Sequence, residues 1–566
     1  MAEISILNGY KIKDKKAVRY YDTISNMKSD TTLKAGMYVK TKGYYSTNDG
    51  GSAEYIIRTK TNEDVEDNKT IYFINTSLVA EIVVKNEINL KQLGVTENTD
   101  ITDYINTSLT KYGYANIPSG TYKCNISITS DNYYKIKGNN TILKPNNTSN
   151  PVIDILCAEI SNQKIIEDIK LELTNSETGI KIAKPSTSQR DTYLSQRVIL
   201  KGIYANLDSD FTGVVIDLEY LSEINISDIY IKRTGSESEN TGTGIKISSC
   251  VNLNVYNSSI GYLNKAIDIL TNNKSCEGIS LNNVEMLFNN YGVYAESSNI
   301  YGILSLRVMN CMIDQVQKTG VLFNGVTSSS IINNWFGVNV SDSTAITLLS
   351  SVHENYGAII SDNTIWLNKS SNSYGIYIKR NNDYTIQNTN ISKNTIYNYL
   401  QKAIFIDDTN SIGTLQLNNN YFGTSSNDAT NTPLYYNAIP LRSSITNCIN
   451  DGSTLKINDD ILVKDCINIY NIKTFTASDI TTGSTQRNTS NNNILLYITS
   501  QNNTSNDGYI SIYLGDSQSN LSQKYIQNIR ANSNNNVVYV VIPANYYYSI
   551  LPSSAVTINT IYGKYV

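Results

Sequence analysis

Potential metal ligands are scarce in this sequence. Its 566 residues include one histidine, and the seven cysteines are widely spaced, with no Cys-x-x-Cys pair. Structural zinc sites need such grouped ligands, so we expect no metal ion and no cofactor. The odd number and wide spacing of the cysteines also argue against a disulfide framework, and we expect them to be buried thiols.

Charged residues are few as well. They make up 17% of the chain, and 46 Lys and Arg are balanced by 50 Asp and Glu, for a net charge of −4. This balance provides no basic surface for nucleic acid or an anionic membrane, so neither is expected as a partner. No apolar run reaches about eighteen residues, and no apolar segment follows Met1 closely, so we expect neither membrane insertion nor a secretory signal.

The chain does contain an internal repeat. A small residue followed by alternating apolar residues returns every 22 to 34 residues. Period-two alternation is typical of β-strands, and irregular repeats of this length are typical of a β-solenoid whose coils each contribute several short strands. The repeat begins at Gly179, Gly213, Gly244, Ala266, Gly292, Gly320, Ala345, Gly375 and Ala403.

A second recurring pattern places an asparagine two positions before an apolar residue. In a parallel stack, equivalent residues of successive coils lie about 4.8 Å apart, so aligned asparagine side chains can hydrogen-bond to one another as a ladder. In earlier coils the same inward position is expected to hold smaller or apolar residues, including Cys311. The predicted ladder consists of Asn334, Asn363, Asn394 and Asn420.

About fifty residues before the repeat carry a specific set of motifs. Leu93–Val95 is followed by an amphipathic segment, Thr102–Leu109, by Ile117–Tyr122 with the sequence Ile-Pro-Ser-Gly-Thr-Tyr, and by Ile136–Thr141. This order resembles the opening of the pectate-lyase-like superfamily, in which a short helix caps the first coil. The resemblance implies a right-handed parallel β-helix. The Gly-Asp-Gly that usually precedes the helix is replaced by Glu97–Asp100, so acidic chemistry at this end is not implied.

The first ninety residues carry a second resemblance. Asn8–Tyr10 and Gly43–Gly51, which ends in Asn-Asp-Gly-Gly, are similar to amino-terminal modules of phage tail spikes from Gram-positive hosts. Asn-Asp-Gly-Gly also predicts a tight turn, with a strand at Ala53–Ile57 after it. The resemblance implies that residues 1–90 attach the protein to phage tail or baseplate proteins, and a plain capping module is the alternative.

The coil pattern ends near residue 470. Strand-like segments at 494–497, 509–514 and 537–542 then alternate with polar turns, which predicts a small antiparallel sandwich. The ending is similar to carboxy-terminal domains of phage receptor-binding proteins, which implies trimerisation, glycan binding or both. We therefore predict an all-β chain: an N-terminal module at 1–90, a right-handed parallel β-helix with its entry helix at 91–465, and a C-terminal antiparallel β-sandwich at 466–566.

Alternation from the inward positions predicts which side chains face solvent. Trp335 and Trp366, the two tryptophans of the sequence, are expected to point outward on adjacent coils, with Tyr397 and Tyr421 on the coils that follow. Sugars pack their C–H surfaces on such rings while their hydroxyls reach polar neighbours. These four residues are the predicted glycan-binding site. Packing of the tryptophans under a loop or against a second subunit is the alternative.

Two acids, Glu285 and Asp314, are expected at outward positions on the coils before Trp335. Glycoside hydrolysis needs two carboxyls, roughly 5 Å apart for retention or 6.5–9.5 Å apart for inversion. Glu285 and Asp314 are therefore the candidate catalytic pair, with solvated surface acids as the alternative. Asp407 and Asp408 are a competing pair of acids, in which Asp407 would face outward and Asp408 would enter a turn, and a structural turn role is the favoured interpretation. The polygalacturonase signature motifs are absent from the coils, so the resemblance supplies no mechanism.

These observations predict a homotrimeric phage tail spike that binds a bacterial surface polysaccharide at the virion tail tip, synthesised in the host cytoplasm. Three parallel chains suit a surface that repeats one sugar many times, because multivalency multiplies weak affinities. A polysaccharide depolymerase is one alternative. A structural or adhesive β-helix without catalysis is the other.

Overall fold

The computed structural model describes residues 18–85, 87–129, 132–157, 162–184, 197–234, 240–367, 373–380, 384–399, 402–407, 413–423, 432–436, 443–450, 455–457, 462–466, 469–475, 484–488, 493–543 and 545–565. The chain forms two compact units, Met1–Arg307 and Val308–Val566, which are described in turn. The motif Asn8–Tyr10 lies outside the described residues.

The first unit begins with a five-stranded sheet and the short helix α1 (Ile24–Lys28). The strand order is β1 (Val18–Tyr21), β2 (Tyr38–Thr41), β3 (Glu54–Thr59), β5 (Leu78–Ile82) and β4 (Ile71–Phe73). The predicted turn before β3 is present: the Asp49 carboxylate accepts hydrogen bonds from the backbone N–H groups of Tyr44, Tyr45, Ser46 and Gly51.

An entry helix caps the first coil. After the 3₁₀ turn η1 (Leu90–Leu93), helix α2 (Thr102–Tyr112) buries Ile105 and Leu109 and packs against β6 (Tyr114–Ile117) and β8 (Ile126–Thr129). Strand β7 (Gly120–Cys124) completes the Pro-Ser-Gly turn, and Gly120 has a φ of +137°, which side-chain-bearing residues rarely adopt. The helix that the motifs predicted at Thr102–Leu109 is confirmed.

The coils of the first unit stack their strands in parallel. One sheet, which we call the repeat sheet, is formed by the strands of the small-apolar repeat; it consists of β8, β10 (Ile153–Leu156), β12 (Thr178–Ala183), β14 (Val214–Glu219), β17 (Thr243–Ser248), β19 (Lys265–Leu270) and β21 (Tyr291–Glu296). Ile180, Ile216, Ile245 and Ile267 are in register on successive strands and fully buried. Burial of each such side chain contributes about 2 kcal/mol.

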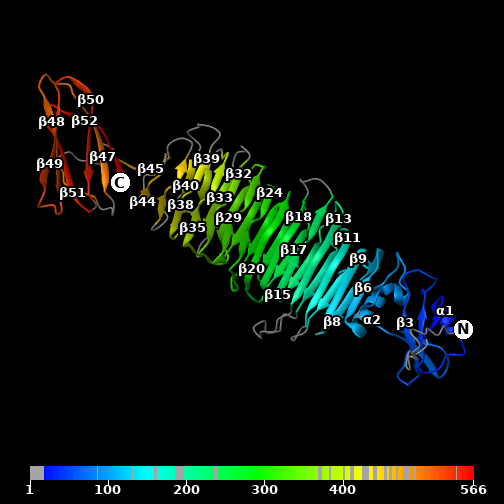
Figure 1. Ribbon diagram of the computed structural model, residues 1–566. Helices are drawn as coiled ribbons and strands as arrows, with labels where there is room; N and C mark the ends of the chain where they lie inside the picture. The colour runs from blue at the N-terminus through cyan, green and yellow to red at the C-terminus, as the bar shows by residue number, and fades with distance from the viewer. Residues whose placement is uncertain are drawn as a thin grey trace, which may run out of the picture. The chain divides into compact units, whose positions relative to one another are not determined.

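Further strands, from 2 to 12 residues long, form another wall of these coils. They are β9 (Tyr134–Pro145), β11 (Lys164–Leu173), β13 (Val198–Leu207), β15 (Ser222–Ser227), β16 (Tyr230–Arg233), β18 (Val251–Gly261), β20 (Cys276–Leu287), β22 (Ile303–Leu304) and β23 (Arg307–Met309). The pairings β9–β11, β11–β13 and β18–β20 are parallel. Figure 1 shows these strands stacked beside the repeat sheet of the first unit.

The second unit also contains coils, and these are made of three parallel sheets. Its repeat sheet consists of β25 (Thr319–Asn324), β29 (Thr344–Ser350), β33 (Tyr374–Arg380), β37 (Lys402–Ile406) and β40 (Thr432–Tyr436). A second sheet, which we call the tryptophan sheet, consists of β24 (Met312–Val316), β28 (Trp335–Val338), β32 (Thr364–Leu367), β36 (Thr395–Tyr397), β39 (Tyr421–Gly423) and β42 (Ile449–Asn450).

The strands of the third sheet alternate along the chain with those of the tryptophan sheet. It consists of β27 (Ser330–Ile332), β31 (Ile359–Ser361), β35 (Thr389–Ser392), β38 (Leu415–Asn418), β41 (Ser444–Thr446) and β44 (Leu462–Lys464). Short strands β26 (Val326–Thr327), β30 (Asn355–Tyr356) and β34 (Ile386–Gln387) pair beside it. The prediction of an all-β chain built on a parallel β-helix is confirmed.

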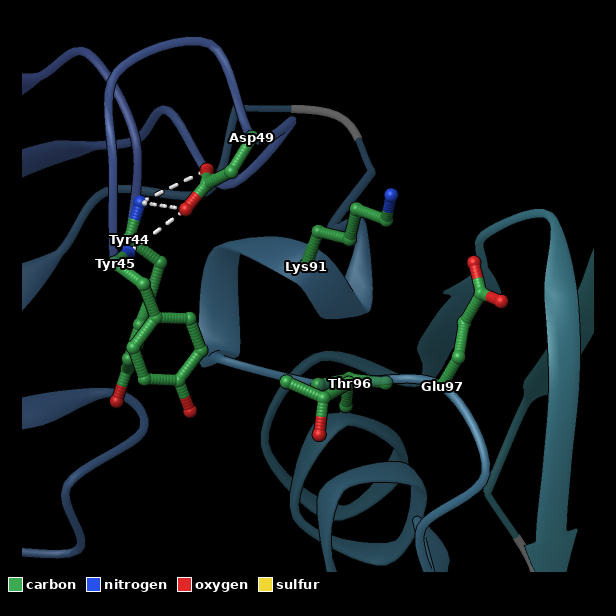
Figure 2. A pocket seen from close by; sticks show the side chains of 7 residues that line it. Tyr44, Tyr45, Asp49, Lys91, Thr96 and Glu97 are labelled. Atoms are coloured by element: carbon green, nitrogen blue, oxygen red, sulfur yellow. Dashed lines mark hydrogen bonds between the residues drawn. The ribbon is translucent and has the colours of Figure 1, made fainter.

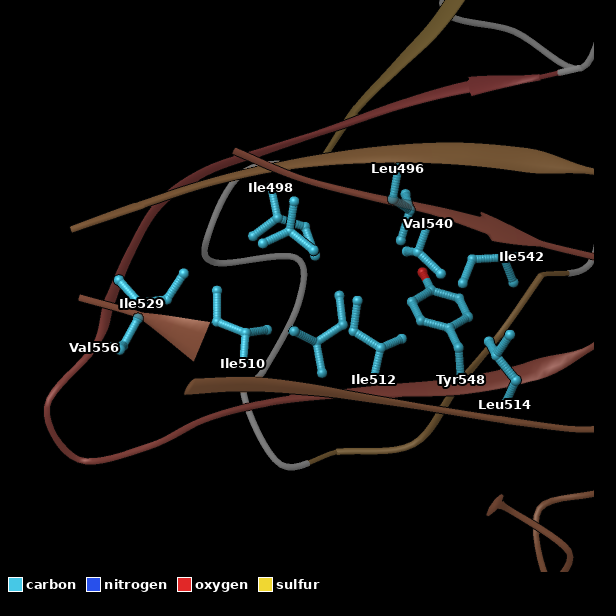
Figure 3. Close-up of a cluster of buried hydrophobic side chains, with 12 residues drawn as sticks. Leu496, Ile498, Ile510, Ile512, Leu514, Ile529, Val540, Ile542, Tyr548 and Val556 are labelled. Atoms are coloured by element: carbon cyan, nitrogen blue, oxygen red, sulfur yellow. The ribbon is translucent and has the colours of Figure 1, made fainter. Parts of the chain in front are cut away.

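An antiparallel sandwich follows the coils of the second unit. One sheet has the order β43 (Leu455–Ile457), β45 (Ile469–Phe475), β52 (Thr557–Tyr565), β47 (Ile494–Asn502) and β50 (Ser533–Ile542). Its pairings are antiparallel except that of β43 with β45, which is parallel. The other has the order β46 (Gln486–Arg487), β51 (Tyr547–Pro552), β48 (Gly508–Gly515) and β49 (Ser522–Ile529). Figure 3 shows the core between them, where Leu496 and Val540 face Ile512 and Tyr548.

The cysteines are free thiols, as predicted, and six of the seven are buried. The prediction of burial is wrong for Cys466, which is half-exposed. Cys466 follows β44, the last described strand of the coils, and its Sγ contacts the carbonyl oxygens of Lys464 and Ile445 at 3.3 and 3.6 Å.

Candidate functional site

Three aromatic side chains form a continuous row on the outer face of the tryptophan sheet. In β32, Trp366 alternates with the buried residues Ile365 and Leu367 and therefore faces outward. Tyr397 of β36 is in register with Trp366, and their ring centroids are 6.0 Å apart. Tyr421 of β39 extends the row, with its ring 5.8 Å from that of Tyr397. The row thus crosses three adjacent strands.

Trp335 of β28 lies on the same outer face, but it is in register with the residue two positions before Trp366 in β32. It is paired with Thr364 of β32, whereas Trp366 is paired with Gly337. The exposed fractions of Trp335 and Trp366 are 38% and 43%, which is high for the largest side chain type. The predicted outward orientation of both tryptophans is therefore observed. Their role in glycan binding stays a prediction.

A glycine makes room for two of these rings. Gly423 is in register with Tyr397 on the next strand. A Cβ atom added at Gly423 would lie 2.9 Å from Cδ1 of Tyr397 and 3.0 Å from Cε1 of Tyr421. Both distances are shorter than ordinary van der Waals contacts, so a larger residue at this position would displace the two rings.

A ladder of buried asparagine amides fixes the start of four strands in this sheet, β28, β32, β36 and β39. The side-chain amides of Asn334, Asn363 and Asn394 donate to Oδ1 of the next asparagine at 2.9, 2.9 and 3.0 Å, ending at Asn420. Each accepting Oδ1 also accepts a hydrogen bond from the backbone N–H of the preceding ladder residue. The predicted ladder is confirmed, and it holds the outward residues that follow it in register.

The residue before each ladder asparagine turns the backbone. Asn333, Asp362, Lys393 and Asn419 have φ values of 56°, 57°, 56° and 55°. Asn and Asp tolerate this left-handed conformation better than most residues, which explains why three of the four positions carry them.

The two candidate catalytic acids lie in different units. Glu285 of β20 is exposed and in register with Ser259 in the first unit. Asp314 of β24 belongs to the second unit. The alternation around Asp314 is irregular, because the register with β28 shifts between Ile313 and Val316.

The carboxylate of Asp314 is held by its own strand. Its Oδ1 accepts the backbone N–H of Gln315 at 2.8 Å, and Gln315 has a φ of 56°. A Cβ atom on Gly337 would lie 1.8 Å from that oxygen, so the glycine admits the carboxylate. The pairing of Glu285 with Asp314 as a catalytic dyad stays a prediction.

A second aromatic cluster lies on the repeat sheet of the second unit, and it was not anticipated. Tyr374, Tyr377, Phe405 and Tyr435 come from β33, β37 and β40, with centroid distances of 5.2 to 5.7 Å between neighbouring rings. The signal was present in the repeat itself: the outward positions of Gly375–Ile378 and Ala403–Ile406 are Tyr377 and Phe405, which are in register. We call these four rings the repeat-sheet aromatics.

Charged groups frame the repeat-sheet aromatics. The hydroxyl of Tyr377 donates to Oδ2 of Asp407 at 2.5 Å, and Lys379 forms a salt bridge with the same oxygen at 3.2 Å. Burial alone would raise the pKa of Asp407, but these two donors outweigh it and lower the pKa. Asp407 faces outward, as expected; Asp408 lies outside the described residues.

A lysine lies on these rings. The ammonium of Lys402 is 3.7 Å from the ring centroid of Phe405 and 4.0 Å from that of Tyr435. Burial lowers the pKa of Lys402, and the nearby Asp407 charge offsets this in part.

The first unit has a similar lysine that carries its own counter-ion. The Lys265 ammonium lies 3.7 Å from the ring centroid of Tyr294 and forms a salt bridge with Asp268 at 3.0 Å. Asp268 is only 6% exposed, and burial raises its pKa although the Lys265 charge opposes the shift. A carboxyl locked to a lysine in this way is a structural ion pair rather than an accessible acid.

The first unit also contains a pocket of about 320 Å³ between the Tyr44–Asp49 turn and the segment Lys91–Glu97. Figure 2 shows its wall, where Tyr44 and Tyr45 lie opposite Lys91 and Glu97. Burial would raise the pKa of Asp49, but its four backbone donors lower it. Asp49 therefore anchors the turn of the pocket wall and is not available as a proton donor.

The described residues include no group of three or more His, Cys, Asp or Glu side chains placed to hold a metal ion. Within the same part of the chain, no helix has the length and apolarity needed to cross a membrane.

Several solved structures are similar to this chain. The tailspike gp49 of Acinetobacter baumannii bacteriophage Fri1, described as a capsular polysaccharide depolymerase, is 12% identical, with a TM-score of 0.43 and coverage of 97% of both chains. Tailspike protein 2 of Escherichia coli O157:H7 bacteriophage CAB120 is 10% identical, with a TM-score of 0.41 and coverage of 96% of this chain and 76% of that one.

An enzyme that is not a tail spike is similar to the same degree. The A-module of the Azotobacter vinelandii mannuronan C-5 epimerase AlgE6 is 13% identical, with a TM-score of 0.42 and coverage of 64% of this chain and 99% of that one. No family model matches the sequence. No curated protein is similar to it in sequence.

Proposed function

We propose that this protein is a phage tail spike that binds a bacterial surface polysaccharide along the row of Trp335, Trp366, Tyr397 and Tyr421. The observation that carries the proposal is the continuous, solvent-facing run of rings across β32, β36 and β39. Such rings offer apolar faces to successive sugar units, and the half-buried Thr364 and Thr395 beside them supply hydroxyl partners. The asparagine ladder keeps the row rigid, which limits the entropy lost on binding.

The wider assembly belongs to the same proposal. Three chains form a homotrimer at the virion tail tip, and residues 1–90 attach it to tail or baseplate proteins. The resemblance of the N-terminal and C-terminal segments to phage modules supports this arrangement. Trimerisation would present three identical aromatic rows to a repetitive glycan, which raises avidity without any new contact.

Two substitutions test the aromatic row. On an array of purified bacterial capsule and wall polysaccharides, Trp366→Ala and Tyr397→Ala are expected to weaken binding by about 1–3 kcal/mol each. Tyr204→Ala is the matched control, because Tyr204 is a 52% exposed ring that packs at 5.5 Å on Tyr230 in the first unit. Full affinity in both row variants would refute the proposal.

The same variants examine the alternative that Trp366 packs against another subunit. Light scattering gives the mass of each variant in solution. A smaller assembly for Trp366→Ala, with unchanged affinity per chain for the glycan, would assign Trp366 to the subunit interface.

Hydrolysis of the bound polysaccharide is the alternative activity. Incubation with the retained polymer, followed by size analysis, distinguishes the two functions: shortened chains require an enzyme, and unchanged chains with saturable binding mean recognition alone. If the polymer is shortened, Glu285→Gln and Asp314→Asn should each abolish shortening, because each removes one of the two carboxyls that glycoside hydrolysis needs.

A further inference from the structure

The repeat-sheet aromatics and the aromatic row lie on different sheets of the same coils. The four rings Tyr374, Tyr377, Phe405 and Tyr435 project from strands of the repeat sheet, and the row projects from the tryptophan sheet. A ligand could therefore contact one surface without the other. The two surfaces also differ in chemistry, because only the repeat-sheet aromatics surround a lysine.

Lys402 is held by rings rather than by a carboxylate. Its ammonium lies over Phe405 and Tyr435 and 5.8 Å from the ring centroid of Tyr374. Among the residues that the structure describes, none forms a salt bridge with it, and the nearby Asp407 is engaged by Tyr377 and Lys379. Ring faces attract the charge but accept no strong hydrogen bond, so the three N–H donors of Lys402 are available to a ligand.

Comparison with Lys265 shows what is unusual about Lys402. Both ammonium groups lie 3.7 Å from a ring centroid on a repeat-sheet strand. Lys265 has the carboxylate of Asp268 at 3.0 Å as its counter-ion. Lys402 has the same aromatic support without such a partner, so its positive charge is pre-positioned and lacks a close counter-ion.

We propose that Lys402 and the repeat-sheet aromatics form a subsite for an acidic sugar unit, one that carries a carboxylate or a phosphate. The Lys402 ammonium would donate to the anionic group. The stacked rings of Tyr374 and Tyr377, 5.7 Å apart and inclined by 18°, would offer an exposed face for the sugar ring to pack on. The Asp407 carboxylate would accept a sugar hydroxyl. The inference rests on the proposed glycan recognition and specifies the class of glycan.

An anionic glycan fits this surface better than an apolar protein face. Covering Lys402 with apolar atoms would bury an unpaired ammonium, which costs several kcal/mol. An anionic group would instead form an ion pair with the Lys402 ammonium. The surrounding rings partly exclude water, so this ion pair would be stronger than one in bulk water.

The test uses the full chain on an array of bacterial polysaccharides whose repeat units carry uronate, phosphate or no charge. Wild-type protein is expected to bind acidic polymers more tightly than neutral ones. Lys402→Gln should lower that affinity about tenfold or more, because it removes a charged hydrogen bond. Lys265→Gln is the matched control and should bind like wild type. Thermal unfolding of both variants verifies that they are folded.

Each outcome has a defined meaning. Preference for uronate or for phosphate polymers identifies the source of the anion, and either result supports the subsite. Retention of neutral polymers only, or unchanged affinity of Lys402→Gln for acidic ones, overturns it. If binding depends on Trp366 but not on Lys402, the subsite fails while the proposed function stands. If it depends on Lys402 but not on Trp366, the aromatic row fails instead. Binding to no polymer counts against both.

Discussion

Asn363 and Asn394, on successive coils, are joined by two hydrogen bonds to one oxygen. The side-chain amide of Asn363 donates to Oδ1 of Asn394 at 2.9 Å, and its backbone N–H donates to the same oxygen at 3.1 Å. The amide of Asn363 also donates to the carbonyl of Ile331 at 2.9 Å. Both asparagines are buried, with exposed fractions of 1% and 0%. The residues of the aromatic row follow directly after the ladder residues in the chain. The ladder therefore stabilises the coils and also positions the candidate site.

Asn363→Ala should destabilise the protein by about 2–4 kcal/mol, because it leaves buried donors on Asn334 without an acceptor. The shift in the urea unfolding midpoint measures the effect. Asn254→Ala is the control, since Asn254 bonds to Asn225 at an exposed position and should cost less than about 1 kcal/mol. Equal shifts for the two variants would show that the ladder has no special role.

Acid should weaken the N-terminal sheet through Asp67. Burial alone would raise the pKa of Asp67, but hydrogen bonds from Thr70, Ile71 and Lys111 outweigh it and hold the pKa well below its usual value. A carboxyl whose pKa is lower in the folded state stabilises the fold above about pH 4, and this contribution fades as the pH falls through the folded pKa.

Asp67→Asn should therefore destabilise this sheet by roughly 1–3 kcal/mol at neutral pH, with a smaller difference from wild type below about pH 4. Hydrogen exchange of peptides from β3 and β5, compared between variants at each pH, reports on the sheet. Asp22→Asn removes an exposed pair with Lys42 and should have little effect. A wild-type–variant difference that does not change with pH would contradict this role for Asp67.

The sequence predicted those features that depend on alternation alone. Period-two patterns determine which residues face inward, so the ladder at Asn334 and the outward directions of Trp335 and Trp366 could be derived from the repeat. The cluster around Lys402 could not, because it depends on lateral contacts between β33, β37 and β40 and on the lack of a carboxylate beside one ammonium. The irregular register at Asp314 was also not predictable, since a single left-handed residue, Gln315, breaks the alternation.

Thiol reactivity should single out Cys466. It is the partly exposed cysteine, and the neighbouring Cys448 thiol lowers its pKa. The other six are buried, and burial raises the pKa of Cys124 and Cys250. A thiol reagent at pH 8 should modify one cysteine per native chain quickly, and Cys466→Ser should abolish this fast phase. Fast modification of several cysteines in the native protein would contradict the buried-thiol assignment.

Intrinsic fluorescence reports directly on this surface, because Trp335 and Trp366 are the only tryptophans of the chain, Trp366 lies in the row of rings, and Trp335 lies on the same outer face. A saturating glycan should shield them from acrylamide, since stacking removes ring surface from water. Trp335→Phe and Trp366→Phe separate the two signals. Protection of Trp366 alone would confine the glycan to β32, β36 and β39, whereas protection of both would extend it to β28. If the glycan binds and neither tryptophan is protected, the binding surface lies elsewhere, and loss of binding in Lys402→Gln would then place it on the repeat sheet.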